Sequence, residues 1–149
     1  MSLLRVMVDA DVLFAGSASP SDRSASTVVL RLSDLTLIDG VASRQVVAEA
    51  ERNLAEKVPA AVPRFRELAT ACLRVVPDPT SDEVVALGGL ADPKDLPILT
   101  AAVRERCDVL VTFNEGDYRP GHPDVEVVTP GVLVQRVRRL VALAGRGES

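Results

Sequence analysis

The chain has 149 residues, a formal net charge of −4 and no Trp. A chain of this length is the size of one domain, and we expect it to bury about two-thirds of the surface that its unfolded form exposes. The acidic balance argues against a broad basic surface for nucleic acid, although a cation can bring phosphate to acidic groups. Because aromatic residues are scarce, the core must consist of Val, Leu, Ala and Ile, which favours layered α/β packing.

No targeting or membrane segment is visible in the sequence. The first residues lack the basic, apolar and small-residue order of a signal peptide, and no apolar run approaches the length of a membrane span. Cys72 and Cys107 stand in aliphatic surroundings without CxxC spacing, as is typical of reduced core cysteines. We therefore expect a cytoplasmic protein without a membrane partner.

Apolar periodicity and turn signals predict strands that alternate with helices. The strands are expected over about residues 3–8, 35–39, 73–76, 108–113 and 125–128. The helices are expected over about residues 24–33, 43–57, 60–72, 80–89, 94–106 and 130–143. Ser43 is the expected N-cap of the second helix, and Pro130 the first-turn residue of the last.

This alternation predicts the fold class α/β, with a mostly parallel central sheet of about five strands and helices on both faces. The connections are short, and the sequence contains neither a repeat nor a long linker. We expect a single domain over residues 1–144 and a flexible tail over residues 145–149.

Two carboxylates, Asp9 and Asp11, directly follow the first apolar run in VMVDADVLF. No Lys or Arg lies closer to them than Arg5. Open α/β sheets bind ligands beyond the carboxyl ends of their strands, so the pair is a candidate site. Asp is also common as a cap of turns and helix starts, and the pair alone fits either interpretation.

Acids recur at the start of the fifth predicted helix, in ADPKDLPILTAA. Asp95 lies three and four residues before Ile98 and Leu99, so it shares the helix face that turns toward the sheet. A charged side chain on a buried helix face is costly, so a functional role is one explanation for it. Asp92 or Asp95 can equally act as the helix cap, which satisfies backbone donors and suits the helix dipole.

Two further segments carry candidates. Asn114 and Asp117 follow the apolar strand DVLVTF, where a polar turn around Gly116 is the alternative explanation. In SRQVVAEAERNL, Glu49 and Glu51 both flank the apolar stripe, and periodicity does not choose between them. A Glu in such a position is usually solvated.

The segments VMVDADVLF, SRQVVAEAERNL, DPKDLPILTAA and VLVTFNEGDY, in this order, resemble the PIN-domain family of small ribonucleases, particularly the bacterial stand-alone type related to VapC-like toxins. The likeness spans nearly the whole chain. It implies a PIN-like three-layer α/β/α sandwich and a metal-dependent endoribonuclease that hydrolyses RNA phosphodiesters, as the toxin of a toxin–antitoxin pair. The implied catalytic residues and ligands of Mg²⁺ or Mn²⁺ are Asp9, Glu49, Asp95 and Asp117.

The chain departs from the family pattern at two positions. Asp11 stands where a small polar residue is common, and it is a further candidate ligand, a group that supports the ligands, or a turn cap. Asn114 stands where some relatives have an acid, so the fourth carboxylate is expected at Asp117. Asn114 is then a further candidate ligand, or with Thr112 it orients a water or a neighbouring carboxylate.

The carboxylate cluster that the resemblance implies needs a cation. Two carboxylates about 4 Å apart repel each other by roughly 4 kcal/mol at an effective dielectric constant of 20. Ligands that are all oxygen select hard cations, and the absence of Cys or His beside the acids argues against zinc. His122, in RPGHPDV, is interpreted as a loop residue. Mg²⁺ or Mn²⁺ is therefore the expected cofactor.

Basic side chains beside the motifs are candidate contacts of RNA phosphates, or else solvated surface groups: Arg44, Arg52, Lys94 and Arg119. The RVRR run over residues 136–139 is interpreted as a solvated face that can also receive an acidic or peptide-like partner. The resemblance further implies an antitoxin protein that covers the site, and it leaves a homodimer open.

Two other functions fit part of the sequence. VMVDADVLF superficially resembles the start of haloacid-dehalogenase-type phosphatases, but that motif continues with Gly-Thr, where this chain has Val12 and Leu13. The other alternative is a non-catalytic PIN-like protein that binds RNA or a partner. The near-complete set of acids argues against it.

Overall fold

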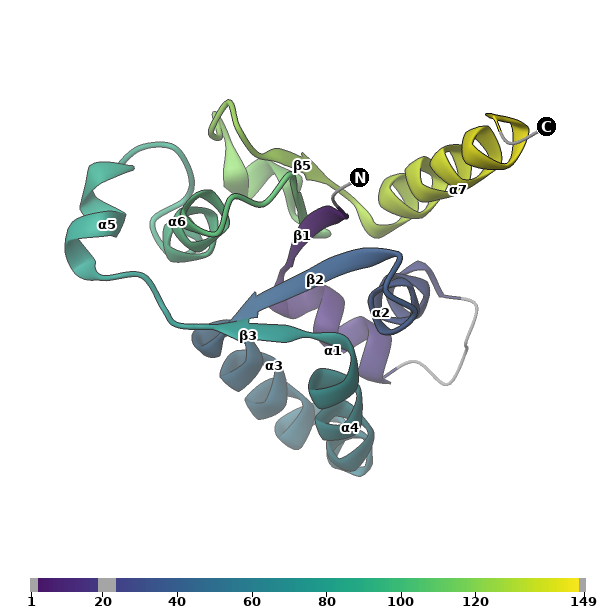
Figure 1. The fold of residues 1–149 in the computed structure, drawn as a ribbon. Coiled ribbons are helices and arrows are strands. Elements are labelled where there is room, and N and C mark those ends of the chain that lie inside the picture. The colour runs from purple at the N-terminus through teal and green to yellow at the C-terminus, as the bar shows by residue number, and fades with distance from the viewer. Residues whose placement is uncertain (1–2, 19–23, 148–149) are drawn as a thin grey trace.

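Within residues 3–18 and 24–147, which the computed structural model describes, the chain forms a five-stranded sheet (Figure 1). The strands are β1 (Leu4–Val8), β2 (Ile38–Ser43), β3 (Arg74–Val76), β4 (Val109–Val111) and β5 (Glu126–Val128). They are ordered β3-β2-β1-β4-β5, and each described pairing is parallel. The predicted mostly parallel sheet is therefore confirmed.

Helices cover both faces of this sheet. They are α1 (Ala10–Ala18), α2 (Ala25–Asp34), α3 (Arg44–Lys57), α4 (Val62–Cys72), α5 (Ser81–Ala86), α6 (Leu96–Arg104) and α7 (Pro130–Gly147), with short 3₁₀ turns η1 (Pro59–Ala61) and η2 (Glu115–Tyr118). Right-handed crossovers place α1 to α4 on one face, where they contact one another, and α5 and α6 on the other (Figure 1). The predicted α/β/α sandwich is confirmed.

The core explains why the chain adopts these layers. Val6, Met7 and Val8 are consecutive residues of β1 and are each at most 1% exposed, as expected of a central parallel strand that is covered on both faces. Cys72 and Cys107 are buried and free, as predicted. Among the described helices, none is both long enough and apolar enough to cross a bilayer.

The helix α1 was not predicted. Its nine residues follow β1 directly and include Gly16, a poor helix former. The tertiary structure explains that glycine: a Cβ at Gly16 would lie 2.8 Å from Cδ1 of Leu30, so α1 and α2 can approach this closely only without one. Packing against α2 therefore overrides the weak local preference.

The second strand begins three residues later than predicted, at Ile38 rather than at residue 35. Leu35 ends α2, and Thr36 has a φ of 58°, which strand geometry does not allow. The observed strand contains Gly40, which weakened the strand signal. A Cβ there would lie 2.4 Å from Oγ of Ser33, which accepts a hydrogen bond from the Gly40 backbone N–H.

The last helix is longer than predicted. It begins at Pro130, as expected, but continues to Gly147 rather than ending at residue 143. The segment RRLVALAG is rich in helix formers and supplies no early stop. Residues 145–147 of the predicted tail are therefore helical, and residues 148–149 lie outside the described part of the chain.

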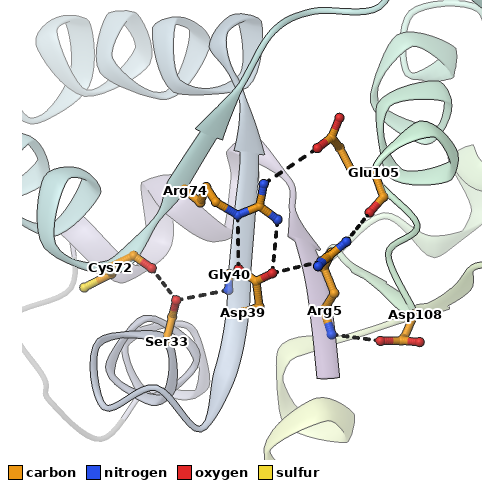
Figure 2. A network of polar contacts seen from close by, with 8 residues as sticks. All are labelled: Arg5, Ser33, Asp39, Gly40, Cys72, Arg74, Glu105 and Asp108. Carbon is orange, nitrogen blue, oxygen red and sulfur yellow. Dashed lines mark hydrogen bonds and ion pairs between the residues drawn. The ribbon is translucent and has the colours of Figure 1, made fainter. Parts of the chain in front are cut away.

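A network of ion pairs lies at the amino ends of the strands (Figure 2). Nε of Arg5 lies 2.8 Å from Oδ2 of Asp39, and Nη2 of Arg74 lies 3.0 Å from the same oxygen. Burial raises the pKa of Asp39, but hydrogen bonds from Arg74 and Arg5 outweigh it and hold that pKa below its ordinary value. The acid at this end of the sheet is thus neutralised by its own neighbours.

Candidate active site

A cavity of about 500 Å³ lies at the opposite end of the sheet, beyond the carboxyl ends of β1 and β4. From β1 the chain crosses toward β2, whereas β4 lies on the other side of β1, so the sheet order reverses here. Open α/β sheets bind their ligands at such a reversal. The structure brings all six candidate residues to the cavity wall, namely Asp9, Asp11, Glu49, Asp95, Asn114 and Asp117.

Asp9 is held by three hydrogen bonds. Its Oδ1 accepts from the Ala10 backbone N–H at 2.7 Å, at the start of α1. Its Oδ2 accepts from the hydroxyls of Thr112 at 2.9 Å and Tyr118 at 2.8 Å. The side chain of Asp9 is therefore held in one orientation in the wall of the cavity.

Asp11 ties α1 to the segment after β4. Its Oδ2 accepts from the Phe113 backbone N–H at 3.0 Å and from Nδ2 of Asn114 at 2.9 Å. Its other oxygen, Oδ1, is buried without a hydrogen-bond partner among the described residues. Burial, and then the charge of Asp9, raise the pKa of Asp11 above its ordinary value.

Asp95 occupies the N-cap position of α6 but does not act as a cap. Within the described chain its side chain makes no capping hydrogen bond, and its Oδ2 is buried without a hydrogen-bond partner. Asp92 instead accepts from the Lys94 backbone N–H at 3.1 Å and forms the local turn. Burial first, and then the charge of Asp9, raise the pKa of Asp95 to about 6, although Lys94 opposes the rise.

Lys94 supplies the positive charge nearest to these acids. Its Nζ lies 3.9 Å from Oδ2 of Asp95 and 3.6 Å from Oδ2 of Asp117. Asp117, with a side chain 36% exposed, comes from η2, whose chain is held by a 2.7 Å hydrogen bond from the Asp92 backbone N–H to the Asp117 carbonyl. A cation thus already fits between two of the candidate ligands.

The helix α3 contributes the remaining wall and settles the choice between its two acids. Glu49 lines the cavity, whereas Glu51 points to α4, where its Oε1 lies 2.6 Å from Nε of Arg66. Arg52 and Lys94 also line the cavity, as two of the four predicted phosphate contacts. In the described part of the chain the other two, Arg44 and Arg119, are not among the lining residues, and neither is His122.

A comparison of the sequence with models of known protein families agrees with this arrangement of acids around the cavity. A model of the PIN domain matches residues 5–116, which include Asp9, Glu49 and Asp95. This chain belongs to the PIN-domain family. With that membership, nothing supports the phosphatase alternative. No curated protein matches the sequence.

Solved structures share the PIN fold with this chain. VapBC2 from Rickettsia felis, bound to a DNA fragment from its promoter, is 17% identical, with a TM-score of 0.64 over 84% of this chain and 98% of that one. A toxin–antitoxin complex from Klebsiella pneumoniae is 21% identical, with a TM-score of 0.63 over 84% and 97%. VapC20 from Mycobacterium tuberculosis, a toxin that cleaves the sarcin–ricin loop, is 13% identical, with a TM-score of 0.51 over 70% and 86%.

The donors of this PIN domain fit a hard divalent cation by their chemistry. Asp11 Oδ1 and Asp95 Oδ2 are buried carboxylate oxygens without a hydrogen-bond partner among the described residues, in the wall of one cavity. Oxygens of this kind are the ligands that Mg²⁺ and Mn²⁺ prefer. Across residues 3–18 and 24–147, however, no three carboxylate, His or Cys side chains come close enough to hold one ion as they stand. Lys94 Nζ, 3.9 Å from Asp95 Oδ2 and 3.6 Å from Asp117 Oδ2, stands between two of these acids instead.

The sequence missed several residues that line the cavity or support its wall. Tyr118 is 2% exposed and donates to Asp9, although it appeared to be part of a polar turn. The period of α3 could have found Asn53 and Lys57, because they lie four and eight residues after Glu49 on the same face. Phe14 had no signal, since α1 itself was not predicted.

Proposed function

We propose that this PIN domain is a cytoplasmic, Mg²⁺- or Mn²⁺-dependent endoribonuclease that hydrolyses RNA phosphodiesters, with Asp9, Glu49, Asp95 and Asp117 as its catalytic residues and metal ligands. The observation that carries the proposal is the acidic cavity at the reversal of the sheet order, in whose wall Asp95 Oδ2 and the nearby Asp11 Oδ1 are buried without a hydrogen-bond partner among the described residues. Buried polar atoms without a partner are costly, and a cation is the partner that suits carboxylates.

The side chains of the site have distinct tasks in this mechanism. Thr112 and Tyr118 fix the orientation of Asp9 through their hydroxyls, and burial raises the pKa of Tyr118, so it stays a donor. Asp11 holds the segment after β4 against α1. When bound, Mg²⁺ or Mn²⁺ supplies activation of water for in-line attack and neutralisation of charge at the leaving oxygen. A nucleophile from the protein is then unnecessary.

The test is cleavage of a fluorescently labelled single-stranded RNA by the purified protein. We expect cleavage with added Mg²⁺ or Mn²⁺, none in EDTA, and none by Asp95→Asn in either condition. Glu51→Gln is the matched control, because Glu51 is an acid of α3 that faces Arg66 instead of the cavity, and it should cleave like the wild type. Undiminished cleavage in EDTA would contradict the metal mechanism.

We further infer that the enzyme is the toxin of a toxin–antitoxin pair. Its fold is shared with proteins of such complexes, and its acidic cavity already accommodates one ammonium group between Asp95 and Asp117. An antitoxin that offers an Arg or Lys to the same acids would block the site. Expression of the chain alone should arrest growth, and co-expression of its genomic neighbour should relieve the arrest. Harmless expression of an active enzyme would instead indicate a housekeeping nuclease.

A second candidate function is a PIN domain that binds RNA or a partner without cutting. One observation favours it: Lys94 already balances the charge of Asp95 and Asp117, and the described acids do not form a ready ligand cluster. This protein would bind RNA equally well in Mg²⁺ and in EDTA and would leave it intact. The cleavage assay therefore decides between the two.

A further inference from the structure

The wall of the cavity that α3 forms carries mainly basic and amide side chains, and Glu49 is its one acid of the proposed mechanism. Along α3, Arg52, Asn53 and Lys57 line the cavity, and from α1 Phe14 lines it as well. Phe14 is half-buried, so part of its ring packs on the core while the rest faces the cavity. An aromatic ring beside two basic side chains is the combination by which proteins hold single-stranded nucleic acid.

We propose that Phe14 is a stacking platform for one unpaired base of the substrate, and that Lys57 and Arg52 bind the phosphates on either side of that base. The inference rests on the proposed function, because it states how the RNA lies in the same cavity. Phe14 follows Asp11 by three residues on α1, so it lies roughly 4.5 Å along the helix axis from Asp11, on the same side of the helix. The stacked base therefore belongs to a nucleotide that adjoins the scissile phosphate.

The contact between Lys57 and the ring supports this assignment. Nζ of Lys57 lies over the ring of Phe14, 5.7 Å from its centroid. This distance is at the long end of the cation–π range of about 6 Å, so the contact is weak, and the side chain of Lys57 is exposed. A base that stacks on the ring takes the place of the ammonium group, which then becomes available to a phosphate oxygen.

The same geometry predicts which RNA is accepted. A base inside a duplex is stacked on both faces by its neighbours, so it cannot also stack on a protein ring. A platform at Phe14 therefore selects single strands, loops or bulges. Because every base has an aromatic face, it confers little preference for one base over another.

The first test uses the fact that the chain has no Trp. Phe14→Trp places a single fluorescent reporter in the cavity, and Leu140→Trp places one at an exposed position on α7 as the matched control. Three probes are titrated in EDTA. They are a single-stranded RNA octanucleotide, an abasic strand of the same length, and an RNA hairpin in which every base is paired because its loop is a non-nucleotide linker.

We expect the octanucleotide to quench the Trp at position 14 and leave the Trp at position 140 unchanged. The abasic strand should bind through its phosphates without quenching, and the hairpin should not quench. Quenching by the abasic strand or the hairpin equal to that by the octanucleotide would overturn the stacking assignment. Binding of the octanucleotide without quenching, or no binding at all, would overturn it as well.

The second test measures affinity for the labelled octanucleotide in the otherwise native chain. Phe14→Leu keeps an apolar side chain against the core but removes the aromatic face, and it should weaken binding roughly five- to 100-fold, whereas Phe14→Tyr should restore it. Lys57→Gln should reduce the salt dependence by about 0.7 in log–log slope, the value for one phosphate contact of a single strand. Thermal unfolding of each variant checks that the domain is folded.

The two proposals fail separately. A wild type that cleaves RNA with Mg²⁺ while Phe14→Leu binds and cleaves equally well refutes the stacking platform and leaves the nuclease intact. A wild type that never cleaves, but whose Phe14→Trp variant is quenched by single strands alone, refutes the nuclease and leaves the base site intact. Equal affinity of Phe14→Leu and the wild type counts against the platform in either case.

Discussion

Replacing Asp95 with Asn should stabilise the metal-free protein at neutral pH. The carboxylate of Asp95 has a buried, unpartnered Oδ2, and burial together with the charge of Asp9 raises its pKa to about 6 from an ordinary value of 3.8. Between these two pH values the folded protein binds more protons than the unfolded chain. The free energy of unfolding of the wild type therefore falls as the pH rises through this window.

The size of the effect follows from the difference between the two pKa values. A difference of about two pH units corresponds to roughly 3 kcal/mol of destabilisation above pH 6. The side chain of Asp95 is 17% exposed, so water screens part of this cost. The carboxamide of Asn also remains buried in part, at a smaller cost than a charge. We expect Asp95→Asn to raise the free energy of unfolding by about 1–2 kcal/mol at pH 7.5.

Urea denaturation of both proteins in EDTA, at intervals from pH 4 to pH 7.5, measures this difference. The two curves should coincide near pH 4, where Asp95 is protonated in the folded state, and should separate as the pH rises. Parallel curves, or a variant less stable than the wild type at pH 7.5, would refute the reasoning and make Asp95 a structural cap after all.

Three other changes test the surrounding contacts. Tyr118→Phe removes the 2.8 Å hydrogen bond to Asp9 and should lower the free energy of unfolding by about 1–2 kcal/mol in urea denaturation, and a variant as stable as the wild type would show that the bond contributes nothing. Lys94→Gln removes a cation from the acids and should tighten Mg²⁺ binding roughly fivefold in calorimetric titration, whereas weaker binding would make Lys94 a supporting residue. Asp39→Asn breaks the network in Figure 2 and should lower stability by about 1 kcal/mol at pH 7. Because the pKa of Asp39 is lowered in the folded protein, this difference should begin to shrink as the pH falls below the ordinary value of 3.8 and should be lost as the pH passes through the lowered pKa, and a difference that is undiminished at pH 2.5 would contradict the ion-pair origin.

Local patterns in the sequence were sufficient for most of the elements. Short runs of Val, Leu and Ile marked every strand, and in the central strand β1 the reason is that both of its faces are covered. The N-cap at Ser43 was visible from its residue type, and its Oγ accepts from the Val46 backbone N–H at 3.3 Å. The helix α1, which the sequence missed, contains Gly16, whose close approach to α2 no local pattern encodes, and the late start of β2 follows from the positive φ of Thr36.

For the site, the sequence by itself determined which acids stand beyond strand ends and at the start of a helix, because a strand end is a local feature. Only the tertiary structure decided that Glu49 rather than Glu51 lines the cavity: Glu51 faces α4, where it pairs with Arg66. It also decided that Asp95 is no cap, because the side chain makes no capping hydrogen bond with the described residues. The pKa of Asp95 is raised instead by burial and by the charge of Asp9, which come from distant parts of the chain. The pKa of a carboxylate depends on its distances to other charges, and these distances are fixed only when the pairing of β1 with β4 brings the two strand ends together.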